Sequence, residues 1–210
     1  MTTHFYAFGS ICRGEVDRSS DVDLLACVSG PNSDKADIDT AKFSVYQHDR
    51  LRELWAEGNP FAWHLHLESR LLFASDGVDF IAGLGAPAIY KAGAQDCAKF
   101  ATLFRESLQP LVETRVSSTF NLSCMFLATR NFATCYSLWQ GQPVFSRRSP
   151  LMIAPSLKVD ATAFEVLSRA RVLSTRGYGD PLTDEDVMLA TEAAPAIQAW
   201  MAPLLAEVQG

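Results

Sequence analysis

Apolar and polar residues follow two different patterns along this chain. Up to about residue 75, short apolar runs alternate with turn-forming residues, whereas from about residue 92 apolar residues recur every three or four positions. The first pattern is typical of strands and the second of amphipathic helices. We therefore expect an α+β protein, with a small mixed-sheet domain at residues 1–80, a linker at 81–91 and an all-helical bundle at 92–210.

In the first part, apolar runs predict strands at residues 4–8, 24–28 and 41–46. Residues 63–68 read Trp-His-Leu-His-Leu-Glu, and this two-residue period predicts a fourth, half-buried strand. Between the last two, Asp49 precedes a helical stretch, and an acid in this position is typical of a helix start.

In the second part, the spacing of apolar residues predicts helices at about 97–112, 118–140, 160–175 and 183–208. Pro110 is expected to kink or end the first helix, and Pro195 to bend the last. Asp160 suits the N-cap of the third helix. Six residues of the second helix are expected in the bundle core: Phe120, Phe126, Phe132, Tyr136, Leu138 and Trp139.

The most informative residues for chemistry follow the first predicted strand. Gly9-Ser10 ends that strand, and Asp21-Val22-Asp23 leads into the next. Alternate residues of a strand point to the same face, so Asp21 and Asp23 can share one divalent cation, and Mg²⁺ takes oxygen ligands. A Gly-Ser turn offers N–H groups and a hydroxyl to a phosphate. Together these residues predict phosphoryl or nucleotidyl transfer.

The stretch from Phe8 to Leu24 resembles the polymerase-beta-like nucleotidyltransferase superfamily, in particular its small bacterial, minimal members. The likeness rests on Gly9-Ser10, Arg13-Gly14, and Ser20 before the Asp21-Val22-Asp23 triplet; a Gly-x-x-Phe-x-x-His-Leu run from Gly58 extends it to about residue 75. This resemblance implies a nucleoside triphosphate site made by Gly9, Ser10, Arg13 and Ser20. It also implies that Asp21 and Asp23 hold Mg²⁺ or Mn²⁺.

Catalysis in that superfamily needs a third carboxylate from a later strand, and this chain departs from the pattern. The predicted strand 41–46 offers only Lys42 or Ser44 at the matching place. Three acids elsewhere are substitutes: Asp39, Asp49 and Glu68. Because Asp49 suits a helix start, Glu68 is the preferred third catalytic carboxylate. The nearby His64 and His66 are too few for a zinc site, which takes three or four protein ligands.

The helical part has a weaker resemblance to HEPN four-helix domains, carried by residues 127–136. HEPN ribonucleases have four to six residues between an Arg and a following His on one helix. Here Tyr136 follows Arg130, and no His occurs after His66. The sequence therefore excludes an RNA-cleaving site of that type, and Arg130 is expected to form a structural ion pair.

Composition narrows the partners. The formal net charge of −6 argues against a general nucleic-acid binder, but it allows a nucleotide or a small cationic substrate. No apolar run is long enough for a membrane span. The N-terminus enters a predicted strand without an apolar leader, and the five Cys form no paired motif. These features favour a cytoplasmic protein with reduced thiols.

Two functions of different classes remain open. The first is a metal-dependent transferase that moves a nucleoside monophosphate from a nucleoside triphosphate to a hydroxyl of a small molecule or a protein. The second is a catalytically degenerate, regulatory or antitoxin-like protein that binds a nucleotide or a partner protein through the same site. The missing third carboxylate separates the two. An exposed apolar face of the bundle would favour a homodimer.

Overall fold

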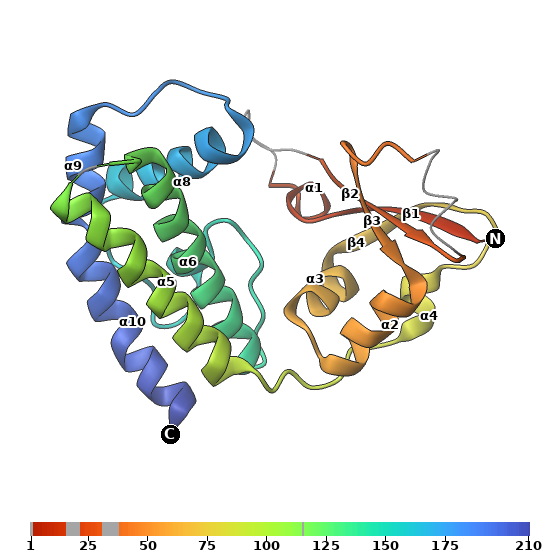
Figure 1. Ribbon diagram of the computed structural model, residues 1–210. Coiled ribbons are helices and arrows are strands. Elements are labelled where there is room, and N and C mark those ends of the chain that lie inside the picture. The colour runs from red at the N-terminus through yellow and green to blue at the C-terminus, as the bar shows by residue number, and fades with distance from the viewer. Residues whose placement is uncertain (1, 16–21, 31–37, 115) are drawn as a thin grey trace. The chain divides into compact units, whose positions relative to one another are not determined.

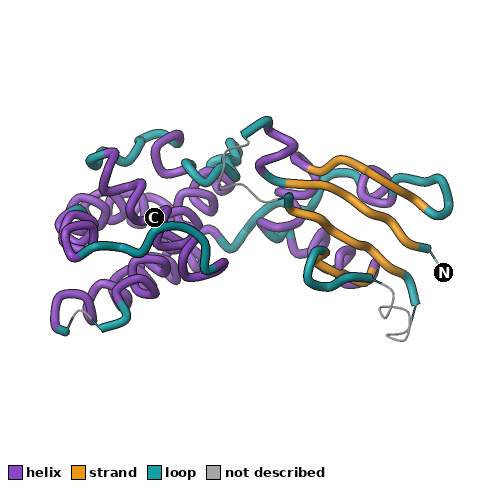
Figure 2. Tube along the Cα trace, turned by 90° about the horizontal axis from the view of Figure 1, so that it is seen from above, coloured by secondary structure: helices purple, strands orange, loops and turns teal. Residues whose placement is uncertain are grey.

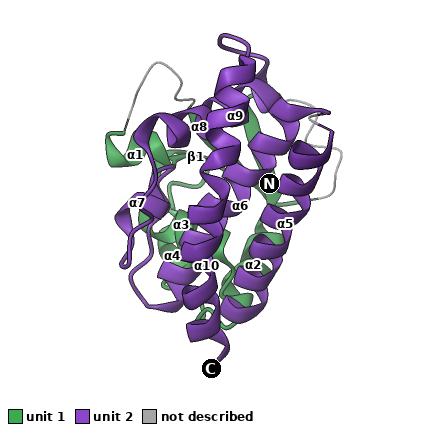
Figure 3. Ribbon diagram, turned by 90° about the vertical axis from the view of Figure 1, so that its left-hand side faces the viewer, with its two compact units in different colours: residues 1–91 green, residues 92–210 purple. Residues whose placement is uncertain are grey.

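The computed structural model describes residues 2–15, 22–30, 38–114 and 116–210, and the fold is α+β as expected. The chain divides into two compact units, Met1–Lys91 and Ala92–Gly210, which we call unit 1 and unit 2 (Figure 3). Unit 1 contains the sheet, and unit 2 is helical.

Unit 1 is built on a four-stranded mixed sheet (Figure 1). Its strands are β1 (Thr3–Phe8), β2 (Asp23–Val28), β3 (Phe43–Gln47) and β4 (Ser69–Ala74), in the spatial order β3-β2-β1-β4. The central strand β1 is antiparallel to both β2 and β4, while β3 runs parallel to β2. Gly9 and Asp23 therefore meet where β1 ends and β2 begins.

Three helices cover one face of this sheet: α2 (His48–Glu57), α3 (Pro60–Glu68) and α4 (Phe80–Leu84) (Figures 1 and 2). Alternate residues of β1 and β2 face them and form the core with leucines of α2 and α3. A single helical turn, α1 (Ser10–Arg13), follows β1. The buried side chains of the core are Tyr6, Phe8, Leu25, Cys27, Leu51, Leu54, Trp55, Ala62, Leu65 and Ile81.

The expected strand at 63–68 is wrong, because these residues lie in α3. The side chain of Asn59 caps this helix by accepting the Phe61 N–H at 2.9 Å, and Pro60 occupies its first turn. Ala62 and Leu65, three residues apart, are its buried positions. A capped start with proline in the first turn outweighs the two-residue alternation. Glu68 is therefore the last residue of a helix.

Residues after β4 are attached to unit 1 up to the boundary. The Tyr6 hydroxyl donates to Asp79 at 2.9 Å, and this ties α4 to β1. The indole N–H groups of Trp55 and Trp63 donate to the carbonyls of Gly85 and Ala88 at 2.9 and 3.0 Å. We call residues 85–90 the strap, because these bonds hold the segment against α2 and α3.

The described residues of unit 2 form six helices, with α6 in the middle of the bundle. In chain order they are α5 (Gly93–Glu113), α6 (Ser118–Trp139), α7 (Ser149–Met152), α8 (Ala161–Arg176), α9 (Asp184–Glu192) and α10 (Ala194–Gln209). The helices α5 and α6 form an antiparallel hairpin, against which α8 and α10 pack (Figure 1). Within the described residues, no helix is long and apolar enough to cross a membrane.

Most helix signals of unit 2 are confirmed. Asp160 caps α8 as expected, accepting the N–H groups of Thr162 and Ala163. The helix α5 runs one turn past Pro110 before it ends, and near Pro195 the expected last helix is divided into α9 and α10. A proline in the first turn loses no helical hydrogen bond, so the division falls just before it.

Four of the six expected core residues of α6 are buried. The placement of the other two was wrong, because Phe120 is 60% and Trp139 is 39% exposed. Both lie near an end of α6, which spans Ser118–Trp139.

Candidate functional site

The site begins at Gly9, where β1 turns into α1. Gly9 has a φ of 74°, a conformation that favours glycine. A Cβ atom on Gly9 would lie 2.6 Å from Oδ2 of Asp23, closer than real side chains approach. Two constraints therefore require glycine here, and one of them is the Asp23 carboxylate itself. The sequence signals Gly9-Ser10 and Asp23 are brought into direct contact.

Backbone hydrogen bonds fix the turn that follows. The Cys12 N–H donates to the Gly9 carbonyl at 3.0 Å, and the Glu15 N–H donates to the Ser10 carbonyl at the same distance. Gly14 ends α1 in the left-handed conformation, with a φ of 73°. Arg13 therefore lies within one helical turn of the end of β1.

Arg13, Glu68 and His64 form a compact charged group beside this turn. Arg13 Nη1 donates to Glu68 Oε2, and His64 Nε2 lies 2.9 Å from the same oxygen. The three side chains are only 14–18% exposed. On its other side, Arg13 donates from Nε to the more exposed Glu15 at 2.9 Å. Glu68 is thus committed to two partners, one of which is a predicted phosphate-binding residue.

The electrostatics of Glu68 follow from this position. Burial raises the pKa of its carboxyl, but the hydrogen bond to His64 and the charge of Arg13 outweigh that effect, so the pKa is lowered overall. Glu68 is therefore an anion near neutral pH. A carboxylate that already has cationic and hydrogen-bonded partners is a poorer metal ligand than a free one, because the metal must displace them.

The sheet register separates the other candidates for a third carboxylate. Leu24 pairs with Phe43, and extending this parallel register by one residue brings Lys42 to the level of Asp23. Lys42 Nζ lies 3.3 Å from Asp39, and both side chains are exposed. Asp49 lies at the opposite end of the sheet, since α2 begins after Gln47, which pairs with Val28. Asp39 and Glu68 remain at the end where Asp23 lies.

Glu68 and Asp23 lie on opposite sides of β1. Phe8 pairs with Asp23 on one side and with Ser69, the neighbour of Glu68, on the other. Two strand spacings amount to about 10 Å between the Cα atoms of Asp23 and Ser69. The ring of Phe8 is in edge contact with His64, the partner of Glu68, at 5.6 Å between centroids. The geometry thus assigns the two carboxylates different surroundings.

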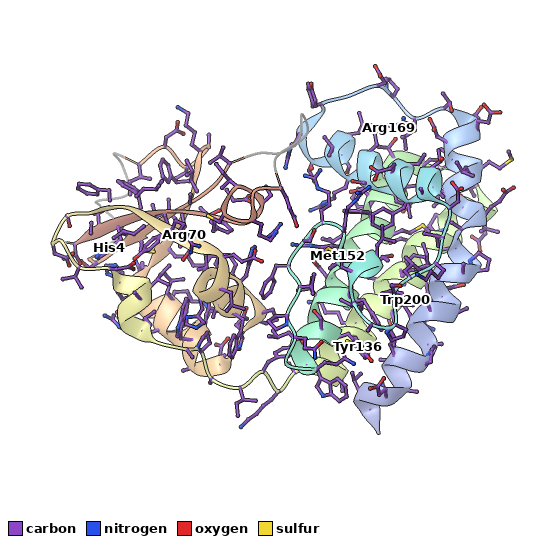
Figure 4. The ribbon with its side chains drawn as sticks, turned by 180° about the vertical axis from the view of Figure 1, so that it is seen from behind. His4, Arg70, Tyr136, Met152, Arg169 and Trp200 are labelled. Atoms are coloured by element: carbon purple, nitrogen blue, oxygen red, sulfur yellow. The ribbon has the colours of Figure 1, made fainter. Side chains whose placement is uncertain are left out.

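Two neighbours of the site were missed or undervalued by sequence reasoning. Burial raises the pKa of the Cys12 thiol, Arg70 and Arg13 oppose this, and Glu68 adds to it, so all four groups are close. Cys12 Sγ donates to the Ala7 carbonyl at 3.4 Å, as expected for a packing residue. Arg70 follows Ser69 on β4 and adds an exposed cation beside the mostly buried Arg13 (Figure 4). No local sequence pattern indicates this position, because it depends on the pairing of β4 with β1.

Two predicted site residues, Ser20 and Asp21, lie outside the described residues. Among the residues that the structure describes, no group of three or more His, Cys, Asp or Glu side chains is placed to hold a metal ion. The carboxylate of Asp23 supplies the hard oxygen donors that Mg²⁺ or Mn²⁺ takes, and with Asp21 it would make a two-carboxylate site. The donor type fits these cations, while the described donor set is incomplete.

No protein-family model matches this chain, and no curated protein matches it either.

In unit 2, the residues singled out by the sequence have structural partners. Arg130 Nη2 donates to the Phe145 carbonyl at 2.9 Å and so holds the loop after α6, while the expected ion pair of Arg130 stays a prediction. The buried Tyr136 donates to Glu207 at 2.7 Å and accepts from Gln140 at 2.9 Å (Figure 4). These contacts join α6 to its neighbours within unit 2.

Proposed function

We propose that this protein is a metal-dependent nucleotidyltransferase, which moves a nucleoside monophosphate from a nucleoside triphosphate to a hydroxyl acceptor. The observation that carries the proposal is the contact between Gly9 and the Asp23 carboxylate at the end of the β1–β2 pair. It juxtaposes a phosphate-binding type of turn with a metal-binding type of side chain.

In this proposal the residues of the site have separate roles. Gly9 and Ser10 bind the triphosphate through the turn, and Arg13 contributes a positive charge to it. Glu68 and His64 hold Arg13 in place. Asp21 and Asp23 hold Mg²⁺ or Mn²⁺, which would neutralise phosphate charge when bound. Because the three side chains of the Arg13 group are mostly buried, their charges act with less screening by solvent than surface charges do.

A second function is favoured by one specific feature. Glu68 is bound by Arg13 and His64, and the register brings Lys42 to the level of Asp23. With Glu68 in this role, a general base for the acceptor hydroxyl is not assigned among the described residues. The alternative is a nucleotide- or protein-binding regulator that keeps the triphosphate site and transfers nothing.

Binding is tested first, by the shift of the unfolding midpoint with each of the four ribonucleoside triphosphates, with and without Mg²⁺ or Mn²⁺. A ligand at 100 times its Kd adds about 2.7 kcal/mol of stability. The transferase and the regulator both predict a metal-dependent shift that Asp21→Asn and Asp23→Asn abolish. Unchanged binding in both variants would exclude the site.

Turnover then separates the two functions. Pyrophosphate release or label transfer from the bound nucleotide, in the presence of small-molecule or protein hydroxyl acceptors, supports the transferase. Tight metal-dependent binding without transfer to any acceptor tried supports the regulator. Asp39→Asn is the informative variant here, because Asp39 is the exposed acid at the same end of the sheet as Asp23.

A further inference from the structure

Two buried imidazoles and the partly exposed carboxylate of Asp76 form a hydrogen-bonded chain at the end of β1 away from Gly9. His4 Nδ1 lies 3.0 Å from Nε2 of His48, the first residue of α2. His4 Nε2 lies 3.1 Å from Oδ1 of Asp76, in the turn after β4. His4 is 2% and His48 5% exposed (Figure 4 labels His4). The chain links three segments that are 44 and 72 residues apart in sequence.

An aromatic lid isolates the two imidazoles. The ring of Phe80, in α4, lies 4.1 Å from the His48 ring and 5.7 Å from the His4 ring, between centroids. The Arg52 guanidinium stands 5.2 Å from the centre of the same Phe80 ring. Because the two imidazoles are buried under this ring, water is a poor substitute for the hydrogen-bond partners that His4 and His48 have in the folded protein.

The geometry of these three hydrogen-bonded side chains determines how many protons they can hold together. The Val78 N–H donates to Asp76 at 3.1 Å, and this bond contributes most to lowering the pKa of that carboxyl, so Asp76 is an acceptor. His4 Nε2 must then carry the proton of its bond to Asp76. When both imidazoles are neutral, His4 Nδ1 carries no hydrogen and accepts a hydrogen bond from the N–H at His48 Nε2.

One added proton leaves these bonds intact. It can occupy His48 Nδ1, or it can reside on His4, whose Nδ1–H then donates to a bare His48 Nε2. A second added proton cannot be accommodated, because both of the nitrogens that face each other at 3.0 Å would carry hydrogens. Two adjacent buried cations would also repel each other.

We propose that His4, His48 and Asp76 form an acid-sensitive clasp, which stays closed with at most one added proton and opens when both imidazoles are charged. Opening releases the start of α2 from β1 and from the turn after β4. It also exposes the underside of Phe80 and so loosens α4. The clasp is independent of the nucleotide site, which lies at the other end of β1.

The surrounding groups favour release of the second proton. Burial lowers the pKa of His48, and the charges of His4 and Arg52 lower it further, against the opposing effect of Asp49 and Asp76. The other packed elements supply Cys27 of β2, paired with His4, and Asp79 at the start of α4, bound to Tyr6. A folded-state pKa below the ordinary 6.5 means that the clasp stabilises unit 1 above that pH and is lost as the pH falls.

The full-length chain provides the direct test, because it contains only four histidines. Their ring nitrogens are titrated by ¹⁵N NMR between about pH 8 and pH 5, while amide exchange is followed in α2. We expect His4 to carry its proton on Nε2 at neutral pH, and the amides of α2 to lose protection only as the second of the two imidazoles, His4 and His48, becomes charged. Both imidazoles charged with α2 still protected would overturn the proposal, and so would a bare His4 Nε2.

A variant separates the titration from the packing. His48→Gln keeps an N–H donor for His4 Nδ1 but does not titrate in this range. The acid-induced opening of α2 should then fall by up to about tenfold per pH unit relative to the parent. The matched control is His66→Gln, which removes a histidine of α3 outside the clasp and should leave the acid response unchanged. If His48→Gln opens in acid as the parent does, the clasp is not the sensor.

Discussion

Gly9 and Gly14 have almost the same φ, 74° and 73°, but different surroundings. A Cβ on Gly9 would meet the Asp23 carboxylate, whereas one on Gly14 would meet nothing within 4 Å. Gly9→Ala and Gly14→Ala should each cost about 1–3 kcal/mol of stability through backbone strain. Gly9→Ala alone should displace Asp23 and weaken metal-dependent nucleotide binding by about tenfold or more.

Calorimetric titration with Mg²⁺-nucleotide, at a temperature where both variants are folded, measures this difference. The Gly14→Ala protein is the control for strain without displacement. Equal affinities for the two variants would show that the Gly9–Asp23 contact has no part in binding.

Glu68 also allows a decisive test at the residue scale. If it positions Arg13, Glu68→Gln should weaken nucleotide binding to a similar degree with and without metal, because it acts on the phosphate-binding side chain. A metal ligand would instead change the metal concentration needed for binding. Stability should fall by about 1–3 kcal/mol, as for other hydrogen bonds to charged groups.

The matched control is Glu15→Gln, which removes the outer, more exposed partner of Arg13. Exposed ion pairs contribute about 0–1 kcal/mol, so this variant should stay near the parent. The two carboxylates differ in burial and share one partner. A larger effect in Glu15→Gln than in Glu68→Gln would therefore contradict the positioning role.

The pH dependence of Glu68 has a definite sign. Its folded-state pKa lies below the ordinary 4.5, so its interactions stabilise unit 1 above that pH and are lost as the pH falls through the folded value. Unfolding experiments should show a steeper loss of stability below about pH 4.5 in the parent than in Glu68→Gln. This acid range is distinct from that of the histidine clasp, which begins near 6.5.

At the scale of elements, the strap can lie close to the end of α2 only because the residue there is a glycine. A Cβ on Gly58, which ends α2, would lie 2.5 Å from the Ala88 carbonyl oxygen and 2.7 Å from that of Ile89. Gly58→Ala should lift the strap and expose it to proteases. Gly77→Ala is the control, since Gly77 also has a φ of 74° but nothing within 4 Å of its Cβ position. Limited proteolysis with mass analysis should find new cleavage at residues 85–90 in Gly58→Ala only.

Local signals predicted the elements better than the contacts between them. Asp160 and the Thr183–Asp186 capping box mark helix starts within a few residues, so the sequence reveals them directly. At 63–68 two local signals competed, and the Asn59-Pro60 start prevailed over alternation. Gly9 and Asp23 were each predicted as site residues, whereas their contact depends on the pairing of β1 with β2. The contacts of Arg13 with Glu68 and of His4 with Asp76 join residues 55 and 72 positions apart, so no local pattern encodes them.

At the scale of the whole molecule, the described residues of the candidate site all belong to unit 1, while Arg130 and Tyr136 of unit 2 have partners in their own unit. Mg²⁺-nucleotide at 100 times its Kd should therefore stabilise unit 1 by about 2.7 kcal/mol. Amide exchange that requires global opening of unit 1 should slow by the corresponding factor of about 100. Exchange in the α5–α6 hairpin should stay the same.

Exchange measured by mass spectrometry on the intact chain reads both units at once. Asp23→Asn serves as the control, because it should remove the protection from unit 1 without altering unit 2. Equal protection of both units by nucleotide would show that the ligand couples them, and the acceptor would then have to be sought with unit 2 as part of the site.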